Sequence, residues 1–149
     1  EAEWEYACRA GTTTPFYFGE TITDELANYN ASKSFANEPI GKYRQETTPV
    51  GKFSPNAFGL YDMHGNVLEC CLDDWHGNYE HAPTDGSPWF GDNNNLDQKQ
   101  ERVVLRGGSW FNSPGNSRSA SRELDLKTVK DYIPLNIGFR IVCRVERIL

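Results

Sequence analysis

Four cysteines have the widest chemical potential in this sequence, because thiols can form disulfides, bind metals or attack substrates. They are Cys8, Cys70, Cys71 and Cys143. Neighbouring cysteines such as Cys70 and Cys71 rarely bond to each other, since their side chains diverge. No Cys-x-x-Cys spacing occurs, which argues against a structural zinc site. Buried free thiols in a reducing cytoplasm are the favoured prediction, with a Cys8–Cys143 disulfide or a metal site as alternatives.

Histidines and acidic residues offer a second kind of chemistry, metal binding or acid–base catalysis. His64 and His76 are the candidates, and His76 closes an Asp-Asp-Trp-His run at 73–76. Neither histidine has a third ligand at a spacing typical of metal sites. No Gly-rich phosphate loop follows a predicted strand, and isolated histidines do not define a catalytic triad. We therefore expect surface or turn roles for both.

Composition narrows the classes of function. The chain has 149 residues, enough for one domain or part of one, and a net charge of -6. Its 15 basic residues are scattered, whereas nucleic-acid binding requires clustered Lys and Arg, so no nucleic-acid partner is expected. No apolar run reaches the roughly 18 residues of a transmembrane helix, so no membrane partner is expected. The 13 Gly and 8 Pro predict a loop-rich fold.

One helix, several short strands and long loops are predicted to position these side chains. Residues 1–10 are predicted to form a helix that Gly11 ends, with Ala2, Trp4, Ala7 and Cys8 on one face. Residues 12–20 contain alternating aromatics, as in an extended segment or edge strand. The remaining predictions are a short strand or buried segment at 63–72, loops at 31–46 and 77–100, and strands at 103–105 and 137–145. The fold class is therefore mixed α+β.

The last two predicted strands bracket a polar loop at 111–134 that has little periodicity. Irregular loops held between strands commonly carry binding residues. Phe111, Leu124, Leu126 and Tyr132 are candidates for exposed binding anchors, because such side chains among polar ones suit protein recognition. The alternative is ordinary packing of these side chains onto the core.

Five short motifs occur in order along the chain. They are Glu-Ala-Glu-Trp-Glu-Tyr-Ala at 1–7, Asn-Ala-Phe-Gly-Leu-Tyr-Asp-Met at 56–63, Gly-Asn-Val at 65–67, Arg-Gly-Gly-Ser-Trp at 106–110 and Gly-Phe-Arg at 138–140. Together they resemble the formylglycine-generating enzyme family of sulfatase-modifying factor domains. The resemblance implies an α+β fold of the C-type lectin-like type. The family has a further N-terminal section, so residues 1–149 are expected to be the C-terminal portion of one such domain in a larger polypeptide.

The resemblance also implies a mechanism from which this chain departs. The family's aerobic enzymes bind copper through two cysteines in the loop after Gly-Gly-Ser, and oxidise a substrate cysteine to formylglycine. Those positions are Asn112 and Ser117 here, and neither side chain is a soft ligand for Cu(I). The family's Gly-Asn-Val-Trp-Glu-Trp also loses both aromatics, to Leu68 and Cys70. We expect no copper and a non-catalytic ligand-binding domain. The alternative is an oxidoreductase acting on protein cysteine, or a related oxygenase of the superfamily.

Calcium is the cofactor that the resemblance implies, since family members bind it near the Gly-Asn-Val turn. Ca²⁺ takes oxygen ligands from carboxylates and turn carbonyls. The alternative is a capped turn in which Glu69 bonds to backbone. A second family site would use the Asn28 side chain and the Tyr29 carbonyl. The first set of expected ligands is Asp62, Gly65, Val67 and Glu69.

The loop further resembles the variable segments of diversity-generating retroelement proteins of bacteria. Residues 107–110 and 136–140 frame loop 111–135 as Gly-Gly-Ser-Trp and Asn-Ile-Gly-Phe-Arg frame those segments. The resemblance implies a diversified surface that binds a protein or peptide. An adjacent reverse transcriptase and an adenine-rich near-copy of the loop's coding region would support it. The residues expected to contact the ligand are Trp110, Phe111, Asn112, Ser113, Asn116, Ser121, Glu123, Leu124, Leu126 and Tyr132.

Overall fold

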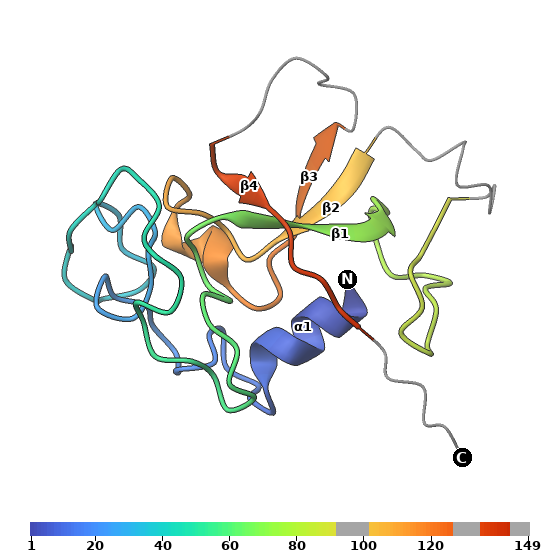
Figure 1. Ribbon diagram of the computed structural model, residues 1–149, viewed down its shortest axis with the longest axis horizontal. Coiled ribbons are helices and arrows are strands. Elements are labelled where there is room, and N and C mark those ends of the chain that lie inside the picture. The colour runs from blue at the N-terminus through green and yellow to red at the C-terminus, as the bar shows by residue number, and fades with distance from the viewer. Residues whose placement is uncertain (92–101, 127–134, 144–149) are drawn as a thin grey trace.

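The described part of the protein consists of a small sheet, an α-helix, a short 3-10 helix and long irregular segments (Figure 1). The computed structural model describes residues 1–91, 102–126 and 135–143. The sheet order is β3-β2-β1-β4, with β1, β2 and β3 antiparallel and β4 parallel to β1. This loop-rich mixture confirms the α+β prediction. The elements are α1 (Ala2–Arg9), β1 (Leu68–Asp74), β2 (Arg102–Arg106), the 3-10 helix η2 (Pro114–Ser117), β3 (Glu123–Leu126) and β4 (Ile137–Gly138).

Helix α1 lies close to where the sequence predicts it. Trp4 and Cys8 are buried on its inner face, whereas Ala2 is exposed and does not share that face. Ala10 takes the left-handed conformation at the C-terminal end, with φ 46, and its N–H donates to the Tyr6 carbonyl. The helix therefore ends one residue before the predicted stop at Gly11.

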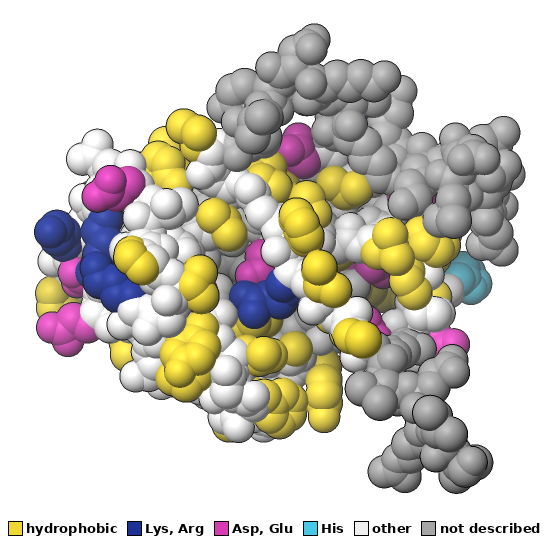
Figure 2. Space-filling model, viewed as in Figure 1, with side chains coloured by type: hydrophobic (Ala, Val, Ile, Leu, Met, Phe, Trp, Pro, Cys, Tyr) yellow, Lys and Arg dark blue, Asp and Glu magenta, His cyan; other side chains and the backbone are white. Residues whose placement is uncertain are grey.

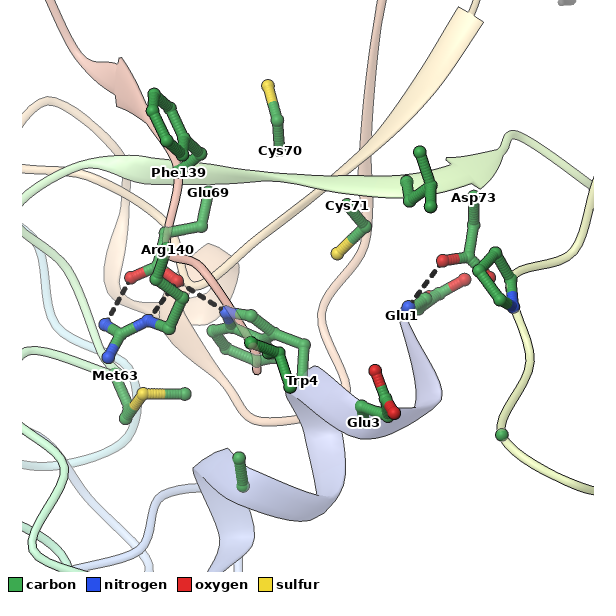
Figure 3. Close-up of a pocket in the computed structure, with 15 residues that line it drawn as sticks. Glu1, Glu3, Trp4, Met63, Glu69, Cys70, Cys71, Asp73, Phe139 and Arg140 are labelled. Atoms are coloured by element: carbon green, nitrogen blue, oxygen red, sulfur yellow. Dashed lines mark hydrogen bonds and ion pairs between the residues drawn. The ribbon is translucent and has the colours of Figure 1, made fainter. Parts of the chain in front are cut away.

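Strands β1 and β2 form the centre of the sheet, and their register assigns side chains to two faces. Cys70 lies opposite Leu105, and Glu69 lies opposite Arg106. Because successive strand residues point to opposite faces, Cys70 and Leu105 share one face while Glu69 and Arg106 share the other. Figure 3 shows Cys71 pointing toward α1 and Cys70 pointing away from it. The helix thus covers the face that carries Glu69 and Arg106.

Loop 111–134 contains more regular structure than its sequence suggests. The 3-10 helix η2 lies within it. Strand β3 pairs with β2, with Glu123 opposite Leu105 at one end and Leu126 opposite Arg102 at the other. Without β3, the N–H and C=O groups on the outer edge of β2 would lack hydrogen-bond partners. Pairing with β3 supplies those partners. The predicted strand at 137–145 is shorter than expected, since β4 spans only Ile137–Gly138.

The segment at 12–20 is a tight turn, which corrects the expectation of an edge strand. Phe16 and Gly19 exchange two backbone hydrogen bonds of 3.1 Å, and Gly19 has φ 135. This turn inserts Phe16 into a core cluster with Ile22, Ala27, Tyr29 and Ala31. A second cluster comprises Trp4, Cys8 and Met63. The aromatic alternation therefore reflects burial in a turn.

Exposed and charged groups are spread over the surface. Hydrophobic side chains are distributed across the face shown in Figure 2, with Lys and Arg at its left edge and near its centre. None of the four cysteines forms a disulfide, so the alternative prediction of a Cys8–Cys143 bond is wrong. Cys8 is buried, whereas Cys70 and Cys143 are exposed. Within the described ranges, no helix is both long enough and apolar enough to cross a membrane.

Arg106, at the end of β2, is the largest fully buried side chain of the described residues. Its Nη1 donates to the Ser121 carbonyl at 2.6 Å, and its Nη2 donates to the Ser119 carbonyl at 2.9 Å. The same guanidinium pairs with the carboxylates of Glu5 and Glu1. Arg106 therefore joins the sheet, helix α1 and the segment before β3.

We expect Arg106→Met to lower the free energy of unfolding by about 3–5 kcal/mol, because buried carboxylates and carbonyls lose their donor. Urea unfolding followed by circular dichroism measures the loss. The matched control is Arg118→Met, which removes an exposed side chain whose Nε donates to the Gly115 carbonyl. That variant should lose less than about 1 kcal/mol, and equal losses would contradict the role assigned to Arg106.

Candidate functional site

His64 lies in the core at 2% exposure, so the predicted surface role is wrong, although the residue does lie in a bend beside Gly65 and Asn66. Its Nδ1 lies 2.6 Å from the Ser117 carbonyl, and its Nε2 accepts the Tyr17 N–H at 3.0 Å. These partners place the ring proton on Nδ1. The rings of Phe16, Tyr17 and Phe18 surround the imidazole at 5.0–5.3 Å. His76 is instead half-buried and stacks on Trp89 at 3.7 Å.

The buried Cys8 thiol lies 3.8 Å from Nε2 of His64, an arrangement that resembles a nucleophile and its base. Burial raises the pKa of Cys8 to about 12 and lowers the pKa of His64 to about 4. Both groups are therefore neutral near pH 7, and both imidazole nitrogens are already hydrogen-bonded. Since nucleophilic cysteines act as thiolates, this pair is structural.

The pKa of His64 predicts a loss of stability in acid. Above pH 6.5 the histidine is neutral in both states; between pH 6.5 and 4 only the unfolded chain takes up the proton. Stability should fall by about 3 kcal/mol over that window, with no further loss from this group below pH 4. Urea unfolding at several pH values measures the slope.

His64→Asn should flatten that slope, whereas His81→Asn, at an 89% exposed side chain, should preserve it. An unchanged slope in His64→Asn would show that other groups carry the acid sensitivity.

The loop after β2 presents aromatic side chains. Trp110 is half-buried and stacks against Tyr43, with ring centroids 6.3 Å apart. Phe111 meets Trp110 edge-on and is 60% exposed. The Asn112 carbonyl accepts the Asn30 N–H at 3.0 Å, which ties this part of the loop to the segment at 28–31. The aromatics therefore extend from a backbone that is held in place.

A polar network lies beside these aromatics. Ser109 Oγ donates to Asn112 Oδ1 at 2.5 Å, and Asn112 Nδ2 donates to Glu123 Oε1 at 3.1 Å. Asn116 Nδ2 also donates to Glu123 Oε1, at 2.6 Å. Asn136 Nδ2 reaches Ser109 Oγ at 3.4 Å. The network brings together predicted residues from the segment before η2, from η2 itself and from β3.

Other predicted ligand residues lie apart from this network. Ser121 contributes its carbonyl to Arg106, on the opposite side of the sheet. Leu124 is 45% exposed and follows Glu123 on β3, so its side chain points to the opposite face. Ser113 is half-buried and occupies the N-cap position of η2, where its side chain makes no capping hydrogen bond. Leu126 ends β3 with its backbone opposite Arg102, and Tyr132 lies outside the described residues.

Asn112 and Ser117, at which the sequence resemblance predicts the positions of the family's copper cysteines, have different environments. Asn112 belongs to the half-buried network, whereas Ser117 is 0% exposed. A Cβ added to Gly108, which has φ +68, would lie 2.4 Å from Ser117 Oγ. The Gly-Gly-Ser turn therefore requires glycine here, because the chain passes directly over Ser117. Within the described ranges, no three His, Cys, Asp or Glu side chains are placed to hold a metal ion.

The predicted calcium ligands are engaged to different degrees. Glu69 receives two 2.5 Å hydrogen bonds from Arg140 and one of 2.8 Å from the Trp4 indole, so it does not bond to backbone as the alternative predicted. Asp62 accepts the Gly51 N–H at 3.0 Å. Asn28 Oδ1 is buried and has no hydrogen-bond partner among the described residues. The carbonyls of Gly65 and Tyr29 accept the N–H groups of Val67 and Ala31, respectively.

A hollow of about 430 Å³ lies between α1 and β1, on the face opposite the polar network (Figure 3). Trp4, Met63, Cys71 and Phe139 line it, and the Glu69–Arg140 ion pair forms part of its wall. Of the predicted ligand and metal residues, only Glu69 borders it. In the sequence, the Glu-Ala-Glu-Trp and Gly-Phe-Arg motifs were the signals that pointed to this hollow, because both supply residues that line it.

Comparison with known proteins decides the family. Residues 1–145 match the model of the sulfatase-modifying factor enzyme 1-like domain, named FGE-sulfatase. The chain belongs to this family. As an FGE-sulfatase domain it is 31% identical to the formylglycine-generating enzyme of Mus musculus over 155 residues, covering 94% of this chain and 37% of that protein. It is 36% identical to the serine/threonine-protein kinase pkn1 of Chlamydia caviae, covering 82% of this chain and 17% of the kinase.

Two solved structures share the fold of this FGE-sulfatase domain. PvdO from Pseudomonas aeruginosa matches with a TM-score of 0.69 and 37% identity, covering 93% of this chain and 48% of PvdO. Variable protein 1 of Treponema denticola matches with a TM-score of 0.60 and 29% identity, covering 93% and 44%. The chain thus spans less than half the length of each of these four relatives.

Proposed function

We propose that this FGE-sulfatase domain is a non-catalytic ligand-binding domain whose loop 111–135 recognises a protein or peptide. One observation carries the proposal. Where the family resemblance predicts two copper-binding thiols, this chain has a hydrogen-bonded loop that exposes an aromatic side chain. Asn112 stands at the first cysteine position and fixes the loop to Glu123, while Phe111 beside it is 60% exposed. Rigid aromatic side chains among adaptable amides suit protein recognition.

The scaffold supports this proposal. We assign the domain to the C-type lectin-like type, in which a small sheet holds a long binding loop. The likeness to a variable protein of Treponema denticola fits a loop whose outward residues change between proteins. Diversification of loop 111–135 by a retroelement is part of the proposal. An adenine-rich near-copy of its coding region beside a reverse transcriptase gene tests that part.

The second candidate function is oxidation of a protein cysteine, because the sequence is similar to formylglycine-generating enzymes. Incubating the chain with a cysteine-containing sulfatase peptide, copper and oxygen tests it. Aldehyde formation detected by mass spectrometry would overturn the non-catalytic proposal. Our expectation is that no aldehyde forms, since a soft ligand pair for Cu(I) is replaced by an amide and a hydroxyl.

Selection of peptides from a display library on the immobilised chain tests the binding function. We expect Trp110→Ala and Phe111→Ala each to weaken binding of the selected peptides by about 30-fold, which corresponds to a hot-spot loss of about 2 kcal/mol. The matched control is Phe58→Ala, which removes a phenylalanine that is 49% exposed outside the loop. Equal affinity in all variants, or selection of no peptide, would reject the loop as the binding site.

Calcium is the cofactor proposed for the site at Asn28. The Asn28 Oδ1 atom is buried and accepts no hydrogen bond among the described residues, so its lone pairs are available to a cation. The carbonyl of the next residue, Tyr29, is the second expected ligand. The set around Glu69 fits less well, because the Arg140 guanidinium already neutralises that carboxylate. A resident Ca²⁺ would therefore stabilise the segment at 28–31, on which the loop backbone is fixed.

Calcium should raise the midpoint of thermal unfolding by roughly 5–10 °C at about 100 times its Kd, because only the folded chain assembles the ligands. Magnesium serves as the ion control. Asn28→Ala should remove the shift, whereas Asp62→Asn, from the other set, should retain it. The reverse result would move the ion to the set around Glu69, and no shift in the unsubstituted chain would reject both sets.

A further inference from the structure

Glu123 differs from three other glutamates that lie in the sheet or at helix α1. Glu1, Glu5 and Glu69 each pair with an arginine. Glu123 is half-buried, yet no ion pair joins it to any residue in the described ranges. A partly desolvated charge without a counter-charge is unfavourable. Its position on the binding loop therefore points to a cation supplied from outside.

The partners of Glu123 orient its carboxylate without neutralising it. Oε1 accepts from both Asn112 and Asn116, whereas Oε2 receives only a long contact of 3.4 Å from Asn112. A carboxylate has about four lone-pair directions. Oε2 thus keeps most of its accepting capacity, and the two neutral amides hold it in one position.

The neighbouring aromatics suit the remainder of a long basic side chain. Phe111 precedes Asn112 in the chain, is 60% exposed and meets Trp110 edge-on. Aromatic faces attract cations, and the alkyl stem of Lys or Arg can lie along apolar surface.

We propose that this surface selects peptides through one Lys or Arg side chain, whose cationic head binds Glu123 Oε2 and whose stem lies toward Phe111. The proposal rests on the ligand-binding function proposed above. It names the chemical class of the recognised residue and assigns the specificity to Glu123. Asn112 and Asn116 are positioning residues, because they hold the carboxylate and need not touch the ligand.

The test is peptide selection from a display library on the full chain, in parallel with Glu123→Gln and the matched surface variant Glu20→Gln. Peptides selected by the unsubstituted chain should share a Lys or Arg at one position. Their affinity should fall about ten- to hundredfold in Glu123→Gln and stay unchanged in Glu20→Gln. Replacing the shared basic residue by norleucine should cause the same loss in the unsubstituted chain and little loss in Glu123→Gln. Added salt should weaken binding to the unsubstituted chain more than to Glu123→Gln.

The outcomes separate this inference from the function on which it rests. Selected peptides that lack a shared basic residue, but depend on Trp110 and Phe111, would overturn the inference and leave the binding function in place. Peptides indifferent to Trp110, Phe111 and Glu123 would overturn both. Thermal unfolding of each variant checks that it is folded. If Glu123→Gln does not fold, the norleucine peptide supplies the decision in the unsubstituted chain.

Discussion

The buried guanidinium of Arg106 is the interaction on which the arrangement of this domain depends. Its donors reach the carbonyls of Ser119 and Ser121, and its charge pairs with two acidic residues of the N-terminal segment. Its Cζ atom lies 5.2 Å from the centroid of the Trp4 ring. Buried charge is tolerated only where partners are numerous and well placed. Arg106 therefore fixes the angle at which α1 lies beneath the sheet and the point at which the chain enters β3.

That constraint reaches the binding surface through one strand. The Arg106 side chain points toward α1, whereas the preceding Leu105 shares the opposite face of the sheet with Glu123. One segment of β2 therefore positions residues on both faces of the sheet. The turn that follows crosses Ser117 with no room for a side chain at Gly108. The polar network of Ser109, Asn112 and Glu123 is consequently built on backbone that the contacts of Arg106 and the turn at Gly108 hold in place.

Part of this architecture could be predicted from the sequence. The helix, strands β1 and β2, and the turn at Gly107 and Gly108 carry local signals of periodicity and glycine. Strand β3 has only a four-residue Glu-Leu-Asp-Leu pattern, and its stability comes from the edge of β2. His64 sits beside a Gly-Asn turn, which favours a surface reading, yet distant aromatic rings bury it. Neither feature is decided by neighbours in sequence, because nonlocal pairing and packing override local preference.

The position of α1 has a consequence for how the chain folds during synthesis. The helix leaves the ribosome before Met63, Glu69 and Arg106, all of which it contacts in the native state. An isolated helix of eight residues is unstable in water. Trp4 therefore meets these three partners only after most of residues 1–106 have been synthesised. Folding dominated by such distant contacts is slow and leaves apolar surface open to chaperones in the meantime.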